Sequence, residues 1–166
     1  MLKNIPPILR NKGLFFKTVD GNSIAKNLYE DINHWNKLRK GESIPEIQQQ
    51  RVLEKIKGKP NYNLEWYDAF NNVASSKIDY LRTMLSNGEK INKEPRITVS
   101  TIHGAKGGEA ANVILFLNQT TNTMRASKKS VYKQDEEYRV WYVGVTRTIQ
   151  NLYLVKCNNK RKEFII

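Results

Sequence analysis

Apolar residues in the first part of the chain recur at the spacing of an amphipathic helix. Between residues 23 and 40 they stand three or four positions apart, at Ile24, Leu28, Ile32, Trp35 and Leu38. This spacing places them on one face of a helix, and Gly41 follows where such a helix would end. The pattern predicts a helix over 23–40 that buries one side.

Two shorter elements are predicted before this helix. Residues 4–12 contain a capping Asn4 and two early prolines, which favour a short helix, and Gly13 follows it. Residues 14–19 are rich in aromatic and β-branched side chains, and Asp20-Gly21 provides turn chemistry after them. We therefore expect a strand over 14–19.

Residues 42–95 predict only helices. Ser43 and Glu46 have the spacing of a capping box, which predicts a helix over 44–57. Two further helical stripes consist of Trp66, Tyr67, Phe70 and Val73, and then of Ile78, Leu81 and Leu85. The aromatic residues Trp66, Tyr67, Phe70 and Tyr80 have the chemistry to stack on single-stranded DNA bases. Their helical spacing favours burial in a core instead.

The segment after residue 95 predicts a strand that leads into a turn. The run from Ile97 to Ile102 is rich in β-branched residues, which favour a buried strand. The glycine-rich segment 103–108 follows, and its composition lets backbone amides and the Lys106 ammonium approach a bound anion. A second apolar run over 113–117 is expected to resume the sheet.

The C-terminal part predicts a helix and a final strand. Residues 134–149 show helical periodicity with Asp135 as the expected N-cap, and residues 152–155 are expected to form a strand. Arg139, Val143 and Arg147 are four residues apart and share a helix face. The polar stretch 118–132 is expected to be a surface loop whose basic residues either contact phosphates or are solvated. Taken together, the predicted helices and strands give an α/β fold class.

Charge points to a polyanionic partner. The 166-residue chain has a formal net charge of +12 and a pI of about 9.8. Such an excess of cations favours a nucleic-acid partner, although a solubilising surface is the alternative. Cys157 is the single cysteine, so no intrachain disulfide or cysteine-rich metal site is possible.

The sequence has no signal of a membrane protein. No apolar run approaches the roughly 20 residues needed to span a bilayer, and the N-terminus has no signal-length apolar segment. We expect a soluble, cytoplasmic protein without a membrane partner.

Two segments resemble helicase signatures. Residues 99–109 read Val-Ser-Thr-Ile-His-Gly-Ala-Lys-Gly-Gly-Glu, and residues 136–147 read Glu-Glu-Tyr-Arg-Val-Trp-Tyr-Val-Gly-Val-Thr-Arg. They resemble motifs V and VI of superfamily 1A DNA helicases of the UvrD, Rep and PcrA type. The sequence Gly-Gly-Glu-Ala at residues 107–110 suggests a phage-like branch of that group.

The resemblance implies a fold and a domain organisation. Residues 1–166 would form the second, C-terminal RecA-like motor domain of such a helicase, with a mostly parallel sheet covered by helices. Residues 42–95 would be a short helical insertion in place of the larger inserted domain of other members. The chain would begin just after the strand that carries motif IV, so the sheet would be truncated at its N-terminal edge.

The resemblance also implies residue roles. Arg147 would be the catalytic arginine that reaches the γ-phosphate of ATP. The nucleotide would be bound by Gly107, Glu109, Gly144 and Arg147, with Glu109 on the ribose, and the DNA backbone by Thr101, His103 and Lys106. No metal ligand is implied. Gly108, Ala110 and Thr148 depart from the family pattern, which bears on how rigidly the loop is held and how tightly nucleotide binds.

The function implied is ATP-dependent translocation on single-stranded DNA. The sequence has no Gly-x-x-x-x-Gly-Lys-Ser/Thr phosphate-binding motif, so the chain alone should not hydrolyse ATP. ATP and Mg²⁺ would require the N-terminal RecA-like motor domain of the same parent protein. The alternative is a free-standing, non-catalytic nucleic-acid-binding module; a third possibility is the helicase-like part of a recombination nuclease, for which the sequence offers no nuclease residues.

Overall fold

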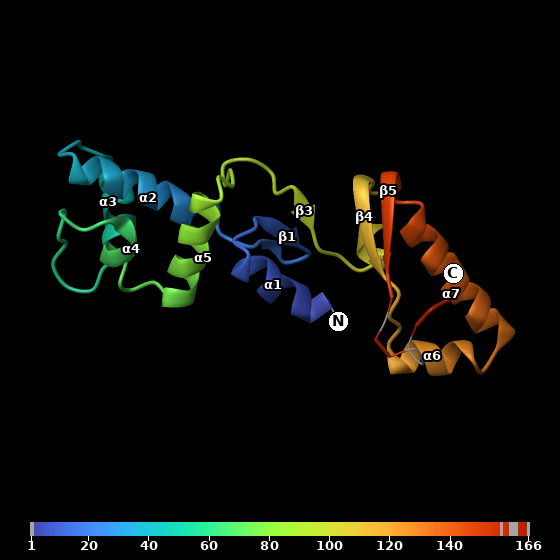
Figure 1. Cartoon of the computed structure of the whole chain (residues 1–166). Helices are drawn as coiled ribbons and strands as arrows, with labels where there is room; N and C mark the ends of the chain where they lie inside the picture. Colours follow the sequence, from blue (N-terminus) through green and yellow to red (C-terminus); the bar gives the residue numbers. More distant parts are fainter. Residues whose placement is uncertain (1, 157, 160–162, 166) are drawn as a thin grey trace. The chain divides into compact units, whose positions relative to one another are not determined.

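The computed structural model describes residues 2–156, 158–159 and 163–165. The chain divides into an N-terminal unit, Lys3–Val99, and a C-terminal unit made mainly of Ser100–Ile166. Both units contain helices and strands, as Figure 1 shows. The expected α/β class is confirmed.

The N-terminal unit contains five α-helices and three short strands. In chain order, after the 3-10 turn η1 (Leu2–Asn4), they are α1 (Ile5–Asn11), β1 (Phe16–Thr18), β2 (Gly21–Asn22), α2 (Lys26–Arg39), α3 (Glu46–Leu53), α4 (Trp66–Ala69), α5 (Ser75–Ser86) and β3 (Ile97–Thr98). Strand β1 lies in the middle of the sheet, antiparallel to β2 and parallel to β3. The amide of Val99 still donates to the carbonyl of Lys17 at 2.8 Å, after which the chain leaves this sheet.

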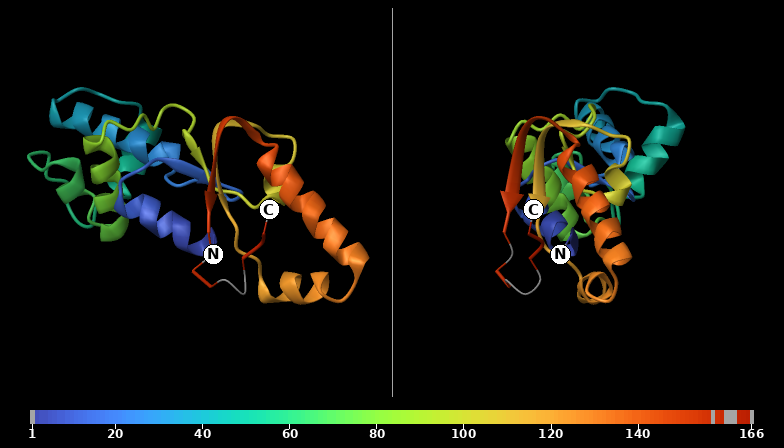
Figure 2. Two further views of the ribbon diagram at one scale, coloured as in Figure 1. Left: turned by 45° about the vertical axis from the view of Figure 1, so that its right-hand side comes forward. Right: turned by 90° about the vertical axis from the view of Figure 1, so that its right-hand side faces the viewer.

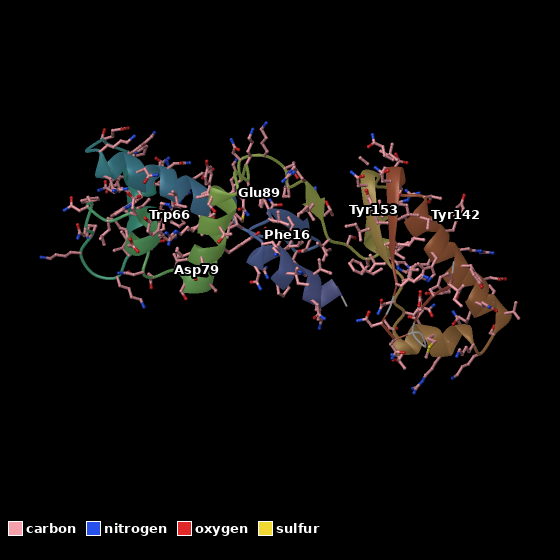
Figure 3. The ribbon with its side chains drawn as sticks, viewed as in Figure 1. Phe16, Trp66, Asp79, Glu89, Tyr142 and Tyr153 are labelled. Atoms are coloured by element: carbon pink, nitrogen blue, oxygen red, sulfur yellow. The ribbon has the colours of Figure 1, made fainter. Side chains whose placement is uncertain are left out.

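Helix α2 confirms the helix predicted over 23–40. Its apolar face is buried, and the indole of Trp35 is fully inaccessible and contacts the Phe70 ring edge-on, with centroids 6.0 Å apart. The core of this unit comprises Phe15, Phe16, Ile24, Leu28, Ile32, Trp35, Val52, Trp66, Ala69, Phe70, Ile78, Tyr80, Leu81, Met84 and Ile91. Figure 3 labels Phe16 and Trp66, which belong to it.

The burial of three of the four aromatic residues confirms the core interpretation over base stacking. Trp66, Phe70 and Tyr80 are each less than a tenth exposed, whereas Tyr67 is partly buried and packs against the same core. The Tyr80 hydroxyl donates to the carbonyl of Leu14 at 2.6 Å and lies 2.7 Å from the Ser23 hydroxyl. Burial raises the pKa of Tyr80 above its ordinary value.

Two helix predictions in this unit were too long. The helix predicted over 44–57 is α3, and Ser43 does not cap it: Pro45 holds the N-cap position without a side-chain hydrogen bond. The stripe that begins at Trp66 forms only the four-residue α4, because Phe70 leaves helical geometry at ψ 52°. The chain then turns to donate from Asn72 to the carbonyl of Lys55, a tertiary hydrogen bond that periodicity does not predict.

A buried carboxylate joins α2 to α3. Asp31 is fully inaccessible and accepts a hydrogen bond from Nε of Arg51, while Nζ of Lys55 lies 4.0 Å from its other oxygen. The hydrogen bond that Arg51 donates to Asp31 is the main reason that the pKa of Arg51 is raised. This ion pair fixes the position of the two helices because a buried charge needs a partner.

In the described residues of the C-terminal unit there are two strands and two α-helices. In chain order they are the 3-10 turn η2 (His103–Ala105), β4 (Ala110–Phe116), α6 (Thr121–Ser127), α7 (Val131–Val145) and β5 (Thr148–Val155). Strands β4 and β5 are parallel, with Ala110 opposite Thr148 and Phe116 opposite Val155, and they lie side by side in both views of Figure 2. On one face, Leu115 and Leu117 pack with Trp141 of α7 and Phe164.

The boundaries of α7 and β5 differ from the prediction. The helix begins at Val131 rather than 134, with Ser130 and not Asp135 as its N-cap, and it ends at Val145. Periodicity predicted that the helix extends to Ile149. Thr148 and Ile149 instead belong to β5, because Ala110 at the start of β4 pairs with Thr148. Both residues are β-branched and suit a strand.

The polar stretch 118–132 is not a loop throughout. It contains α6, whose N-cap Thr120 accepts a hydrogen bond from the amide of Thr123 at 3.1 Å. This capping interaction is local and was missed because the helix has few apolar residues. Cys157 and part of the basic tail lie outside the described residues.

The strands do not form the single sheet expected from the sequence. In the part of the chain that the structure describes, β2-β1-β3 form one sheet and β4-β5 another. Two of the three strand pairings are parallel. No helix among the described residues combines the length and the apolar character needed to cross a membrane.

Replacing Arg51 by alanine should destabilise the N-terminal unit. We expect the free energy of unfolding in urea to fall by about 3 kcal/mol, because the carboxylate of Asp31 stays buried without its hydrogen-bonded cation. As a control, Glu94→Ala breaks an exposed ion pair with Lys17 and should cost less than about 1 kcal/mol. Equal losses in the two variants would contradict the importance of the buried pair.

Candidate functional site

A tight turn carries the glycine-rich segment. The hydroxyl oxygen of Thr101 accepts a hydrogen bond from the amide of Gly104 at 3.0 Å, and the carbonyl of Thr101 accepts from the amide of Ala105 at 3.0 Å. These bonds close η2 directly after the strand-like residues. The predicted DNA-contacting Thr101 therefore also holds the turn in shape.

Gly107 reverses the chain between this turn and β4. Its φ is +82°, in the left-handed region that residues with a Cβ adopt at a cost. The amide of Gly108 donates to the carbonyl of Ala105 at 3.0 Å, which closes the reversal. As a result, Lys106 and Glu109 flank an exposed bend of the backbone.

The side chains of the turn are available for a ligand. His103, Lys106 and Glu109 are all exposed. Among the residues that the structure describes, no hydrogen bond or ion pair involves these three side chains. The turn thus presents an imidazole, an ammonium and a carboxylate to solvent over a short stretch of chain.

Arg147 is attached to the same turn. It follows α7, and its Nη1 donates to the carbonyl of Gly108 at 3.3 Å. Its Nε donates to the carbonyl of Val143 at 3.1 Å, and its Nη2 to the Thr146 hydroxyl at 3.2 Å. The two signature segments are therefore in direct contact through the guanidinium of Arg147.

The backbone reinforces this contact. The amide of Ala110 donates to the carbonyl of Arg147 at 3.0 Å, where the β4–β5 pairing begins. Because the strands are parallel, the residues that precede each of them lie at the same end of the sheet. The pairing register therefore places Arg147 beside the end of the glycine-rich segment.

Gly144 lies where α7 packs most closely on this region. A Cβ at Gly144 would lie 3.3 Å from Cδ1 of Ile102 and 3.4 Å from Cδ1 of Leu115. Ile102 immediately precedes His103, so the helix packs against the base of the turn. Close packing accounts for the glycine, and a contact with nucleotide at Gly144 stays a prediction.

The electrostatic character of the site is set by unpaired charges. In the described part of the chain, Arg147 bonds only to neutral oxygens and has no carboxylate partner. Further along α7 the charges compensate each other: Lys133 and Glu136 form an exposed pair at 2.7 Å, which raises the pKa of Lys133 and lowers that of Glu136. A ligand with negative charge would find its partners at the turn and Arg147.

The structure brings all seven predicted site residues into the C-terminal unit. Thr101, His103, Lys106, Gly107 and Glu109 belong to one turn and its exit, and Gly144 and Arg147 come from the end of α7. Within the described ranges, no three His, Cys, Asp or Glu side chains are grouped so that they could hold a metal ion.

Two residues that shape the site were missed from the sequence. Thr146 accepts a hydrogen bond from Arg147, and Ile102 is the side chain against which Gly144 packs. The position of Thr146 beside Arg147 is a usable signal for the first. The second contact joins residues far apart in the sequence, and periodicity does not reveal it.

Comparison with known proteins gives one family match. The model of the UvrD-like helicase C-terminal domain family matches residues 17–159, which include both signature segments. No curated protein and no solved structure shows significant similarity to the chain.

Enlarging Gly144 should separate α7 from the turn. We expect Gly144→Leu to lower the free energy of unfolding by about 1–3 kcal/mol, because the new side chain overlaps Ile102 and Leu115. Gly144→Ala should be nearly neutral, since the tight contact is offset by the roughly 1 kcal/mol gain in helix propensity. If urea unfolding finds the two variants equally stable, α7 does not pack closely at this point.

Proposed function

Because the chain belongs to the UvrD-like helicase C-terminal domain family, we propose that it forms one side of the ATP site of a translocase acting on single-stranded DNA. The contact between Arg147 and the carbonyl of Gly108 is the observation that carries this proposal. It links the predicted γ-phosphate sensor to the predicted DNA-contacting turn. Through this hydrogen bond, a displacement of Arg147 would directly affect the backbone of the turn at Gly108, and the reverse.

Arg147 has the chemistry of an arginine finger. A guanidinium has five N–H donors, stays charged and pairs best with planar or tetrahedral anions. In its present contacts it donates to two backbone carbonyls and a hydroxyl, all neutral acceptors. A phosphate oxygen is a stronger, charge-assisted acceptor, so binding of ATP would draw Arg147 away from Gly108.

Glu109 and Gly107 suit a nucleoside. The unpaired carboxylate of Glu109 has lone pairs to accept hydrogen bonds from vicinal ribose hydroxyls. Gly107 carries no side chain on an exposed bend, and no atom lies within 4 Å of where its Cβ would be. We propose that the nucleotide lies along this bend, with Gly144 as part of the helix behind it.

Thr101, His103 and Lys106 suit a phosphate backbone. The ammonium of Lys106 supplies charge, and the imidazole of His103 supplies a donor. The oxygen of Thr101 accepts from Gly104, while its hydroxyl proton stays free to donate to a phosphate oxygen. In the intact enzyme, loss of the Arg147–Gly108 bond would change the restraint on this turn and so couple ATP to DNA.

The remaining parts of the motor belong to a partner domain. The chain lacks a Walker A motif, so we propose that an N-terminal RecA-like motor domain of the parent protein supplies the phosphate cradle and the Mg²⁺ that accompanies ATP. This chain alone is then inactive. The cytoplasm, where chromosomal or invading DNA and ATP occur together, is the proposed location, and the phage-like branch stays a prediction.

We further propose that residues 1–166 correspond to the second RecA-like domain, with 42–95 as a short insertion. The parallel pair β4–β5 supports this. On the face opposite Leu115, Ile114 and Tyr153 are 62% and 53% exposed, and Figure 3 labels Tyr153 on β5. Parallel sheets are normally covered on both faces, so such a pair is typical of part of a larger sheet.

Arg147→Ala should abolish ATP turnover. In the protein that also contains the Walker A domain, we expect DNA-stimulated turnover to fall by about 10³-fold, because the transition-state charge loses its guanidinium. Arg139→Ala is the matched control, since it removes an exposed arginine of α7 and should leave turnover unchanged.

Two results would overturn this assignment. Turnover that is unaffected by Arg147→Ala would exclude the arginine-finger role. Tight DNA binding without turnover, in a protein that contains both domains, would favour the non-catalytic nucleic-acid-binding module.

Lys106→Ala should weaken binding of single-stranded DNA mainly through charge. We expect the salt dependence of the association constant, measured by fluorescence anisotropy with a labelled oligonucleotide, to fall by about one counterion. Lys90→Ala removes an exposed lysine of the N-terminal unit and should leave the slope unchanged. Equal slopes for all three proteins would exclude a phosphate contact at Lys106.

A further inference from the structure

A loop of the N-terminal unit is held against α2 by a set of directional bonds. The indole Nε1 of Trp35 donates to the carbonyl of Leu64 at 3.1 Å, and Nε of Arg39 donates to the carbonyl of Tyr62 at 3.3 Å. Arg39 also forms an ion pair with Glu65 at 2.7 Å. Residues 61–65 are therefore a built part of the surface, fixed to the helix at three points.

This loop displays one aromatic ring on the surface. The ring of Tyr62 stacks on that of Trp35, with centroids 5.2 Å apart and an interplanar angle of 26°. Trp35 is fully buried, whereas Tyr62 is 38% exposed. The indole thus supports one face of the Tyr62 ring and fixes its orientation, and the exposed part of the ring faces outward.

Tyr62 borders a polar groove of about 490 Å³. The groove is lined by Asn36, Arg39, Lys40, Tyr62 and Asn63. Among the described residues, the side-chain amides of Asn36 and Asn63 and the ammonium of Lys40 have no hydrogen-bond or ion-pair partner. None of the described residues that line the groove carries a carboxylate, and the charge of Arg39 is compensated by Glu65.

We propose that this groove binds single-stranded nucleic acid, with one base stacked on Tyr62. A fixed, exposed ring offers a stacking platform that any base can use. The free amides of Asn36 and Asn63 can pair with a base edge, because an amide both donates and accepts. Lys40 supplies the cation for a neighbouring phosphate.

The groove and the turn that contains His103 and Lys106 are formed by different residues, in different units of the chain. The groove lies in the N-terminal unit, and none of its lining residues belongs to the two signature segments. The inference rests on the proposed function only for the identity of the polymer. It adds a contact in which the base, rather than the backbone alone, is bound.

The test measures binding of a fluorescein-labelled oligothymidylate of about 15 nucleotides by the full chain. Tyr62→Leu should weaken the affinity about tenfold, since it keeps an apolar cover over Trp35 but removes the ring. Tyr62→Phe should bind like the wild type, because stacking does not need the hydroxyl. Lys40→Ala should lower the salt dependence by about one counterion.

Matched controls separate stacking from a change of fold. Leu64→Ala alters a side chain of the same loop with the same 38% exposure, and Lys77→Ala removes an exposed lysine of α5; neither should change the affinity. An oligothymidylate with one 5-iodouracil should photo-crosslink to Tyr62, as identified by mass spectrometry. An oligouridylate in parallel distinguishes DNA from RNA as the polymer.

The outcomes separate this inference from the proposed function. Unchanged affinity in Tyr62→Leu, together with no crosslink at Tyr62, would exclude nucleic-acid binding at the groove. This conclusion would hold even if Lys106→Ala still weakened binding and the helicase assignment stood. Failure of the wild-type chain to bind either oligonucleotide also overturns the groove. In that case the effect of Arg147→Ala on turnover in the two-domain protein still decides the proposed function.

Discussion

The site depends on the parallel pairing of β4 with β5. Their register starts with Ala110 opposite Thr148, and the residues just before each strand therefore meet at one end of the sheet. One strand is preceded by the glycine-rich turn and the other by Arg147. A shift of one residue in this register would move Arg147 away from the carbonyl of Gly108 and remove the only side-chain hydrogen bond described between the two signature segments.

Close packing holds this arrangement while its reactive groups stay exposed. Gly144 lets α7 lie against Ile102 at the base of the turn, and the positive φ of Gly107 sends the chain back into β4. Neither glycine contributes a functional group. Their effect is to fix the backbone, and the side chains of Lys106 and Glu109 are exposed and have no hydrogen-bond or ion-pair partner in the described part of the chain. The exposure of these side chains is consistent with the proposed binding of nucleotide and DNA.

Local pattern was sufficient for the elements whose neighbours are close in sequence. The spacing from Ile24 to Leu38 predicted α2, and the composition of residues 103–108 predicted a turn.

The sequence pattern was not sufficient where contacts between distant residues determine the structure. Thr148 suits a helix end or a strand and becomes a strand because Ala110 is its partner. Tyr62 was missed as a surface aromatic because Trp35, which supports it, lies far away in sequence. Both signature segments were recognised in the sequence, but the hydrogen bond between Arg147 and Gly108 that joins them was not predicted.

In the proposed mechanism, Arg147 exchanges its bond to the glycine-rich turn for a bond to the γ-phosphate of ATP. Hydrogen exchange followed by mass spectrometry tests this most directly, in the protein that contains both motor domains. We expect a non-hydrolysable ATP analogue to change exchange in residues 103–110 and 143–148 together, whereas ADP, which keeps the ribose but has no γ-phosphate, should leave 143–148 as it is without nucleotide. Identical exchange of 143–148 with the ATP analogue and with ADP would exclude this role of Arg147.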